Sequence, residues 1–259
     1  MPKKISGTKE WAAVTVNCSI GCPNDCRYCY AKRISAQRRD ITRYSEWRKK
    51  NEVRRNKQKE KQLHAGTVMF PSMHDIYEGN LDVCIDVIAN LLEAGNKVLI
   101  TSKPRIKCII ELCDTFEEWK EKILFRFTVG TSDNDILQLW EPGAPTFEER
   151  FACLAYARAR GYQTSVSMEP MLNSVTVIED AKLMMRLVTD GVWIGKMNKI
   201  RDRVTQIPDD EISRIEAGQT DKEIKRIYNA LRYEPKIRWK ESFKEVLGLE
   251  LSKKAGLDQ

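Results

Sequence analysis

Three cysteines lie close together near the start of the chain, at Cys22, Cys26 and Cys29. Their spacing is CxxxCxxC, and an aromatic residue, Tyr28, stands immediately before the third. Iron–sulfur clusters are held by cysteine thiolates, and a four-iron cluster ordinarily takes four of them. Three thiolates from one loop would leave one iron open to a small-molecule ligand. The spacing therefore predicts a metal site of three cysteines holding a [4Fe–4S] cluster.

Zinc binding and a purely structural role are the alternatives for this loop. A zinc site needs a further pair of Cys or His at finger or ribbon spacing, but the chain has only His64 and His74 and no second CxxC. Cys18 could act as a fourth ligand, giving a closed cluster or a structural zinc site; we favour the open cluster and interpret Cys18 as a structural thiol. The other cysteines lie in apolar, helix-like segments and are expected to be buried free thiols: Cys84, Cys108, Cys113 and Cys153.

Strand and helix signals alternate along most of the chain. Short, apolar, β-branched segments occur at 11–17, 66–72, 97–102, 123–132, 162–170 and 191–198. Each is followed by a helix-length segment, and TFEE at 146–149 looks like a capping box at one helix start. This alternation predicts parallel βα units, in a doubly wound sheet or a barrel. We divide the chain into a catalytic part, 1–200, with a basic insertion at about 38–64, and a helical C-terminal extension, 201–259.

The residues around the cysteines are similar to a known family. CPNDCRYCY resembles the cluster loop of the radical S-adenosylmethionine (SAM) superfamily. GTVMFPSMHD, NKVLITSKP and the stretch from TSDNDILQLW to SMEPML resemble its spore photoproduct lyase-like branch. The resemblance covers about 11–198 and implies an α/β fold, a partial (β/α)6 TIM-type barrel with the cluster at the top. It also implies SAM as a second cofactor, cleaved to a 5′-deoxyadenosyl radical, and an external electron donor such as flavodoxin or ferredoxin.

In a parallel barrel, functional residues lie at the carboxyl ends of the strands. We expect Lys103 to pair with the SAM carboxylate, as the resemblance also suggests, and Ser72 and Ser132 to contact the methionyl end. Tyr28 is expected near the adenine. The full set of predicted cofactor-binding residues is Tyr28, Ser72, Lys103, Thr131, Ser132, Met168 and Glu169.

One position departs from the family pattern. Photoproduct lyases resemble one another in a cysteine near the end of the second strand, which donates a hydrogen atom; here Ser72 stands near that place. Because a serine O–H is a much poorer hydrogen donor to a carbon radical than a thiol, the sequence does not support photoproduct repair by that route. We predict instead that His74 and Asp75 do acid–base work on a different substrate, with Tyr30 and Tyr77 as radical relays or, alternatively, as packing residues.

A basic segment follows the cysteine loop. Between Arg38 and Lys61 there are eleven Lys or Arg and four Asp or Glu, a balance equal to the net charge of +7 of the whole chain. Tyr44 and Trp47 lie among the cations, and such aromatics can stack on exposed bases. A solvated helix face is the alternative. We predict a basic lid that binds DNA or RNA through Arg48, Lys49, Lys50, Arg54 and Arg55.

The leading hypothesis is a radical SAM enzyme that modifies or repairs a nucleic-acid base. One alternative moves the radical chemistry to a peptide or small metabolite, with the basic segment docking an acidic partner. The other is a non-catalytic nucleic-acid-binding protein with a structural metal site. The N-terminus, MPKKISGTKEW, lacks the apolar stretch of a secretory signal, and no apolar run is long enough to cross a bilayer. We therefore expect a cytoplasmic protein with no membrane partner.

Overall fold

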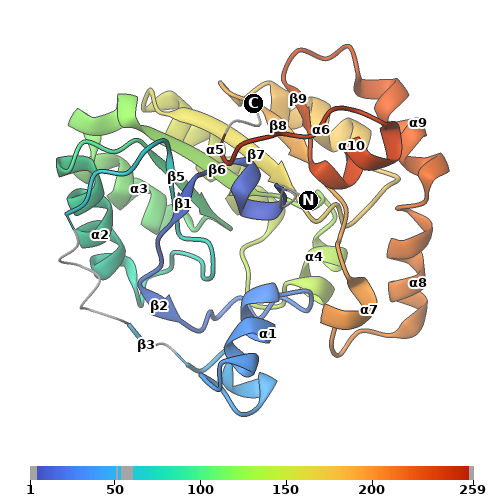
Figure 1. The fold of residues 1–259 in the computed structure, drawn as a ribbon, viewed down its shortest axis with the longest axis horizontal. Helices are drawn as coiled ribbons and strands as arrows, with labels where there is room; N and C mark the ends of the chain where they lie inside the picture. Colours follow the sequence, from blue (N-terminus) through green and yellow to red (C-terminus); the bar gives the residue numbers. More distant parts are fainter. Residues whose placement is uncertain (1–4, 51, 54–60, 257–259) are drawn as a thin grey trace.

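The computed structural model describes residues 5–50, 52–53 and 61–256 of the chain. Its main element is a seven-stranded sheet in the order β1-β4-β5-β6-β7-β8-β9 (Figure 1). The strands are β1 (Val14–Thr15), β4 (Val68–Phe70), β5 (Val98–Ser102), β6 (Ile123–Thr128), β7 (Gln163–Met168), β8 (Val192–Ile194) and β9 (Ile237–Trp239). All neighbours pair in parallel, and the edge strands β1 and β9 do not pair with each other in the described part of the chain. The sheet is therefore an open, partial barrel, as predicted.

Helices connect most of the successive strands, which parallel pairing requires. They are α1 (Tyr30–Gln37), α2 (Leu81–Glu93), α3 (Ile106–Thr115), α4 (Asn134–Trp140), α5 (Phe147–Ala159), α6 (Val177–Met185), α7 (Ile200–Arg203), α8 (Asp209–Ala217), α9 (Asp221–Leu231) and α10 (Glu241–Leu247). Short 3-10 helices lie at η1 (Gly7–Glu10), η2 (Tyr44–Glu46) and η4 (Glu117–Lys122). None of the helices in the described ranges combines the length and apolar character needed to span a bilayer.

The two faces of the sheet bury different clusters of side chains. Met69 packs with Trp11 and Trp193 on the inner side, whereas its neighbour Phe70 belongs to the large cluster shared with the helices. Arg126 also points inward, with its guanidinium 4.7 Å from the ring centre of Trp11 and 5.0 Å from that of Trp193. This alternation follows from the two-residue period of a strand. The inner face of the sheet, at the carboxyl ends of the strands, is therefore available for a site.

The start of α5 forms half of the predicted capping box. The Thr146 hydroxyl accepts a hydrogen bond from the backbone N–H of Glu149 (3.4 Å). The Glu149 carboxylate does not return to Thr146 but accepts from the backbone N–H of Ile106 (3.0 Å). Glu149 thereby satisfies an otherwise unpaired donor at the start of α3 and joins that helix to α5.

The C-terminal residues, predicted to form a helical extension, also contain a strand. Strand β9 pairs with β8 and becomes the seventh strand of the sheet. Its Trp239 ring stacks on Phe243 of α10 with a centroid distance of 5.4 Å and an interplanar angle of 16°. Phe243 is fully buried and belongs to the main core. Residues after 200 therefore complete the same sheet and core as the residues before it.

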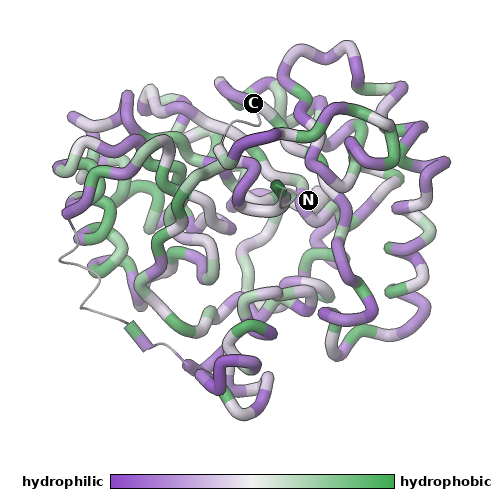
Figure 2. The backbone as a smooth tube through the Cα atoms, viewed as in Figure 1, coloured by the Kyte–Doolittle hydropathy of each residue, from purple (hydrophilic) through white to green (hydrophobic). Residues whose placement is uncertain are grey.

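The basic segment runs directly against the cysteine loop. Strands β2 (Ser19–Ile20) and β3 (Glu52–Val53) pair antiparallel and join the two regions. At Gly21, φ is +98°, and an added Cβ would lie 1.3 Å from the carbonyl oxygen of Lys50, so only glycine allows this close approach. Figure 2 shows that the region around α1 and η2 is mostly hydrophilic, in contrast to the strands and the helices around them. Two of the predicted nucleic-acid contacts, Arg54 and Arg55, lie outside the described residues.

Substituting Phe243→Ala should lower the free energy of unfolding by about 3–5 kcal/mol, because it opens a cavity in the shared core. Chemical denaturation measures this change. Tyr233→Ala is the control, since Tyr233 is 83% exposed, and it should change stability by less than about 1 kcal/mol. An equally small effect of both substitutions would mean that the C-terminal region is separable from the barrel.

Candidate active site

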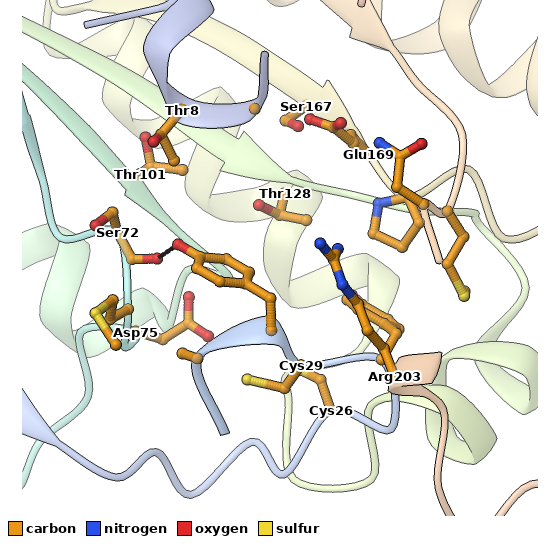
Figure 3. A pocket seen from close by; sticks show the side chains of 18 of the residues that line it. Thr8, Cys26, Cys29, Ser72, Asp75, Thr101, Thr128, Ser167, Glu169 and Arg203 are labelled. Atoms are coloured by element: carbon orange, nitrogen blue, oxygen red, sulfur yellow. Dashed lines mark hydrogen bonds between the residues drawn. The ribbon is translucent and has the colours of Figure 1, made fainter. Parts of the chain in front are cut away.

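A cavity of about 750 Å³ opens at the carboxyl ends of the strands (Figure 3). It is bounded by the cysteine loop, η1 and the loop after β8. It brings together nine of the predicted site residues. These are Cys22, Cys26, Tyr28, Cys29, Ser72, His74, Asp75, Lys103 and Glu169. Residues separated by more than a hundred positions thus meet in one place, as the parallel strand order requires.

The three cysteines of the CxxxCxxC spacing all line this cavity. Cys29 also caps α1, where its sulfur accepts from the backbone N–H of Lys32 (3.4 Å), and a helix N-terminus favours a thiolate. Burial raises the pKa of Cys26 to about 12 and holds the pKa values of Cys22 and Cys29 above their ordinary range. The thiols are therefore neutral unless a metal supplies positive charge.

The donor set fits an iron–sulfur cluster, because cysteine thiolates are the usual ligands of such clusters. Among the described residues, no three His, Cys, Asp or Glu side chains converge as a preformed metal site. The Cys22 thiol instead donates to the Asp75 carboxylate (3.7 Å). Three thiols on one irregular loop, facing a cavity large enough for a second cofactor, match the requirements of a cluster with one open iron.

Cys18 lies apart from these three residues. Its sulfur is 3.7 Å from the sulfur of Cys84 and 3.8 Å from Nε2 of His74. It is fully buried and is not part of the cavity lining. This position supports the interpretation of Cys18 as a structural thiol.

Asp75 holds the cysteine loop against the end of β5. Its carboxylate accepts hydrogen bonds from Nδ2 of Asn24 (2.8 Å), the hydroxyl of Ser102 (3.1 Å) and the backbone N–H of Lys103 (2.7 Å). Burial alone would raise the pKa of Asp75, but Lys103 and the hydrogen bonds lower it below its ordinary value. The carboxylate is therefore ionised, and its contacts favour a positioning role over proton donation.

His74 and Tyr77, the other predicted catalytic residues, are buried among protein groups. His74 Nε2 accepts from the backbone N–H of Cys18 (3.2 Å), and Nδ1 lies 3.1 Å from the carbonyl oxygen of Asp75. Both ring nitrogens of His74 thus face the protein backbone. Tyr77 is 7% exposed and does not line the cavity. Tyr30, the other tyrosine predicted as a relay, does line the cavity, and its hydroxyl donates to the carbonyl oxygen of Ser72.

A buried ionic network that the sequence analysis did not identify lies behind Tyr28. The Glu141 carboxylate is 2.6 Å from the guanidinium of Arg150, and neither side chain is exposed. Glu141 also accepts a hydrogen bond from the Tyr28 hydroxyl and lies 3.9 Å from Nζ of Lys103. In the same loop, an added Cβ at Gly143 would lie 2.1 Å from the carbonyl oxygen of Pro23. The EPGAP sequence therefore forms the support of the cysteine loop.

Lys103 is the cation at the centre of this framework. Its ammonium lies 3.9 Å from both Asp75 and Glu141 and 5.6 Å from the ring centre of Tyr28. Burial by itself would lower the pKa of Lys103, but the anionic groups around it raise the pKa above its ordinary value. Lys103 is thus a permanent positive charge in the cavity wall, which suits the predicted contact with a carboxylate.

Three of the predicted cofactor contacts point away from the cavity. Ser132 donates to Asp180 (2.6 Å), Thr131 lies next to Thr176 (3.4 Å), and Met168 is fully buried in the helix-facing core. None of the three is part of the cavity lining. Strand-end residues that do line it are Thr101, Thr128 and Ser167, all visible in Figure 3. On β7, Ser167 faces the cavity and the predicted contact Met168 does not, because consecutive residues of a strand point to opposite faces of the sheet.

Glu169, the remaining predicted contact, shares a buried lysine with a second carboxylate. Nζ of Lys240 lies 3.3 Å from Glu169 and 2.7 Å from Glu10, and it donates to the carbonyl oxygen of Gly7 (2.9 Å). Burial raises the pKa of Glu169, although Lys240 opposes this change. These contacts attach η1 to the end of β9 and close one side of the cavity.

Substituting Glu141→Gln should lower the free energy of unfolding by about 3–5 kcal/mol, because it leaves the buried Arg150 charge without its partner. The control is Glu179→Gln, which breaks an exposed pair with Lys182 and should cost less than about 1 kcal/mol. Urea denaturation of both variants measures the difference. Equal losses would contradict the central place given to Glu141.

Comparisons with known proteins show what this chain is similar to. Among curated proteins, an uncharacterized protein, ORF301, of Acidianus two-tailed virus is 26% identical over 183 residues, which cover 66% of this chain and 59% of that protein. The chain thus spans less than two thirds of that relative. A spore photoproduct lyase variant with dinucleoside spore photoproduct has a similar fold, with a TM-score of 0.55, 12% identity, and coverage of 92% of this chain and 78% of that one.

SuiB of Streptococcus suis, bound to S-adenosylmethionine, is similar at a TM-score of 0.54 and 12% identity, over 94% of this chain and 54% of that chain. At such identities the likeness shows the fold alone. A family model adds to it: the model described as the Radical SAM superfamily matches residues 16–188, more than half of the chain. The match includes the three cysteines and the strands from β2 to β7. The chain therefore belongs to the radical SAM superfamily and is an enzyme.

Proposed function

We propose that this enzyme modifies or repairs a base in DNA or RNA, using a [4Fe–4S] cluster on Cys22, Cys26 and Cys29. The observation that supports this substrate class is the place of the basic segment. Trp47 lines the cavity, and its carbonyl oxygen accepts from the backbone N–H of Cys22 (3.3 Å). The next two residues, Arg48 and Lys49, are exposed. Cations therefore lie just outside the cavity, where they can bind the phosphates that flank a reacting base.

When bound, the cluster and SAM supply reductive cleavage of SAM to a 5′-deoxyadenosyl radical. The chain contributes the side chains that would surround SAM. Lys103 is a cation for the SAM carboxylate, and the Tyr28 ring forms a wall beside it. Thr101 and Thr128 offer hydroxyl groups on the inner face of the sheet. An external electron donor such as flavodoxin or ferredoxin would reduce the cluster.

The contribution of the basic segment differs in part from the sequence prediction. Trp47 is 1% exposed and packs with Ile20 and Cys22, so it anchors the segment and is not free to stack on a base. Tyr44, at 41% exposed, can stack. Lys50 donates to the carbonyl oxygen of Asp40 and is partly engaged. Arg48, Lys49 and Tyr44 therefore carry the proposed contact within the described residues. Because the cavity is set into the barrel, a base would reach it only when flipped or single-stranded.

A peptide is the second candidate substrate. SuiB, also solved with the precursor peptide SuiA, has a TM-score of 0.52 to this chain, and the match covers 93% of this chain. That score is close to the value for spore photoproduct lyase, so the fold is compatible with either class. In that case the cations of the basic segment would dock an acidic partner.

The ligand set can be tested by anaerobic reconstitution with iron and sulfide. The wild-type protein should become brown and release 5′-deoxyadenosine from SAM in the presence of dithionite. Cys26→Ala should lose both properties, because the cluster loses one of three thiolates. Cys18→Ala is the control and should keep both. A colourless wild-type protein with stoichiometric zinc, or equal loss in the two variants, would contradict the assignment.

The substrate class can be tested by incubating active enzyme with DNA, RNA, nucleosides and peptides, and following products by mass spectrometry. We expect a mass change in a nucleic-acid base, with polymer preferred over free nucleoside. The double variant Arg48→Gln/Lys49→Gln should bind a single-stranded oligonucleotide more weakly, with a salt slope reduced by roughly 1 to 2. Lys182→Gln, a charge change on α6, should leave binding intact. A product found only on a peptide would overturn the proposal.

A further inference from the structure

A second group of cations lines the cavity, on the segment that follows β8. This β8–α7 segment, residues 195–203, contributes Lys196, Lys199 and Arg203 to the lining. Figure 3 shows Arg203 extending from α7 into the cavity, toward Thr128 and Glu169. The group is separate in sequence from the basic segment, and neither the sequence analysis nor the cofactor framework gives it a role.

These three side chains make no ion pair with any residue in the described ranges. Arg201, on the same short helix, provides the contrast. Its guanidinium lies 2.6 Å from Glu216 and 3.6 Å from Asp209. Arg201 is thus neutralised by the protein, whereas Arg203 forms no ion pair within the described residues, although its charge lowers the pKa of Glu169. An unpaired guanidinium in a cavity wall indicates an anion supplied from outside.

Two carboxylates that line the cavity have cations of their own. Asp25 lies 2.6 Å from the ammonium of Lys32. Glu169 is paired with the fully buried Lys240 at 3.3 Å. Neither of the two forms an ion pair with Lys196, Lys199 or Arg203 within the described residues.

The β8–α7 segment is also held in a fixed conformation. The backbone N–H of Lys196 donates to the hydroxyl of Ser242 (3.0 Å), and that of Met197 donates to Oε1 of Gln219 (3.0 Å). Lys199 adopts a left-handed backbone conformation with φ of 56°. For a residue other than glycine this conformation is strained, and such strain is concentrated at ligand-binding segments. The cations are thus positioned before any ligand arrives.

Helix α1 links this segment to the cluster loop and to the basic segment. Arg33 of α1 donates to the carbonyl oxygen of Asp202 (3.1 Å). The backbone N–H of Thr205 donates to the carbonyl oxygen of Arg27 in the cysteine loop (3.2 Å). At its other end α1 contacts η2 of the basic segment. The two cationic groups therefore border the same helix, next to the cavity (Figure 1).

We propose that the β8–α7 segment binds a backbone phosphate of the nucleic-acid substrate inside the rim of the cavity. The planar guanidinium of Arg203 matches two phosphate oxygens, and the lysine ammonium groups add point charges. A strand held at both cationic groups would cross α1 and present the intervening base to the cavity. This inference rests on the proposed nucleic-acid substrate and deepens it, because it names the second phosphate contact.

The test compares variants of the cluster-loaded protein in the absence of SAM, so that SAM binding cannot change the result. Fluorescence anisotropy with a labelled single-stranded oligonucleotide is measured over a series of salt concentrations. Lys199→Gln/Arg203→Gln should weaken binding about tenfold at 0.1 M salt and reduce the salt slope by roughly 1 to 2. The matched control, Arg201→Gln, removes a charge from the same helix and should change affinity by less than about twofold.

Three outcomes would overturn the inference, and they are distinguishable from one another. If Arg48→Gln/Lys49→Gln weakens binding while the Lys199/Arg203 double variant binds like wild type, the β8–α7 segment is not a phosphate site and the proposed function stands. If the double variant binds oligonucleotide normally but needs more SAM for 5′-deoxyadenosine release, its cations serve the SAM carboxylate. If wild-type protein binds no oligonucleotide and alters only a peptide, the proposed function fails together with the inference. Thermal unfolding of each variant excludes loss of the fold as the cause.

Discussion

The carboxylate of Asp75 connects its own loop after β4 with the cysteine loop and with the end of β5, and these three parts must meet for the site to exist. It accepts from Asn24 in the cysteine loop, from Ser102 at the end of β5 and from the backbone of Lys103. A buried carboxylate is costly unless such donors surround it. The cysteine loop has little regular structure of its own, so its position relative to the sheet depends on these contacts. The position of the three proposed cluster ligands therefore depends on satisfying one buried charge.

Glu141 adds a second fixed anion on the other side of Lys103. The two carboxylates each lie 3.9 Å from the Lys103 ammonium, and Arg150 balances the remaining negative charge. Two anions and two cations sum to zero, so this framework orients groups without adding net charge to the cavity. The cations proposed to attract a polyanion are instead Arg48 and Lys49 on one side and those of the β8–α7 segment on the other. The support of the cofactors and the attraction of a polyanion are therefore carried by different residues.

The parts of the structure that were predicted from sequence are those encoded by local pattern. The cysteine spacing, the alternation of strands and helices, and the cap at Thr146 need only neighbouring residues to be recognised. Strand β9 was missed because three residues, Ile237–Trp239, carry little pattern, and only pairing with β8 makes them a strand. The Glu141–Arg150 pair was missed because neither residue reveals its partner in the sequence.

Errors of face and burial have a different cause. Met168 was chosen as a cofactor contact although the preceding Ser167 lines the cavity, because the sequence alone did not show which side of β7 faces the barrel interior. Trp47 was expected among exposed cations, yet it is buried against Cys22, since an aromatic ring next to a hydrophobic pocket gains more from packing than from solvent. Both errors concern tertiary contacts that no local window contains.

The choice of substrate is separable from the generation of the radical in this architecture. Spore photoproduct lyase and SuiB have nearly equal structural similarity to this chain, and their structures hold a dinucleoside photoproduct and a precursor peptide. The shared barrel therefore does not select between nucleic acid and peptide. Selection must come from segments that border the cavity but lie outside the cofactor framework. In this chain those segments are the basic segment and the β8–α7 segment. The cations on both segments that form no ion pair within the described residues support the proposed polyanionic strand, because a peptide would need such charges only if it were acidic along its length.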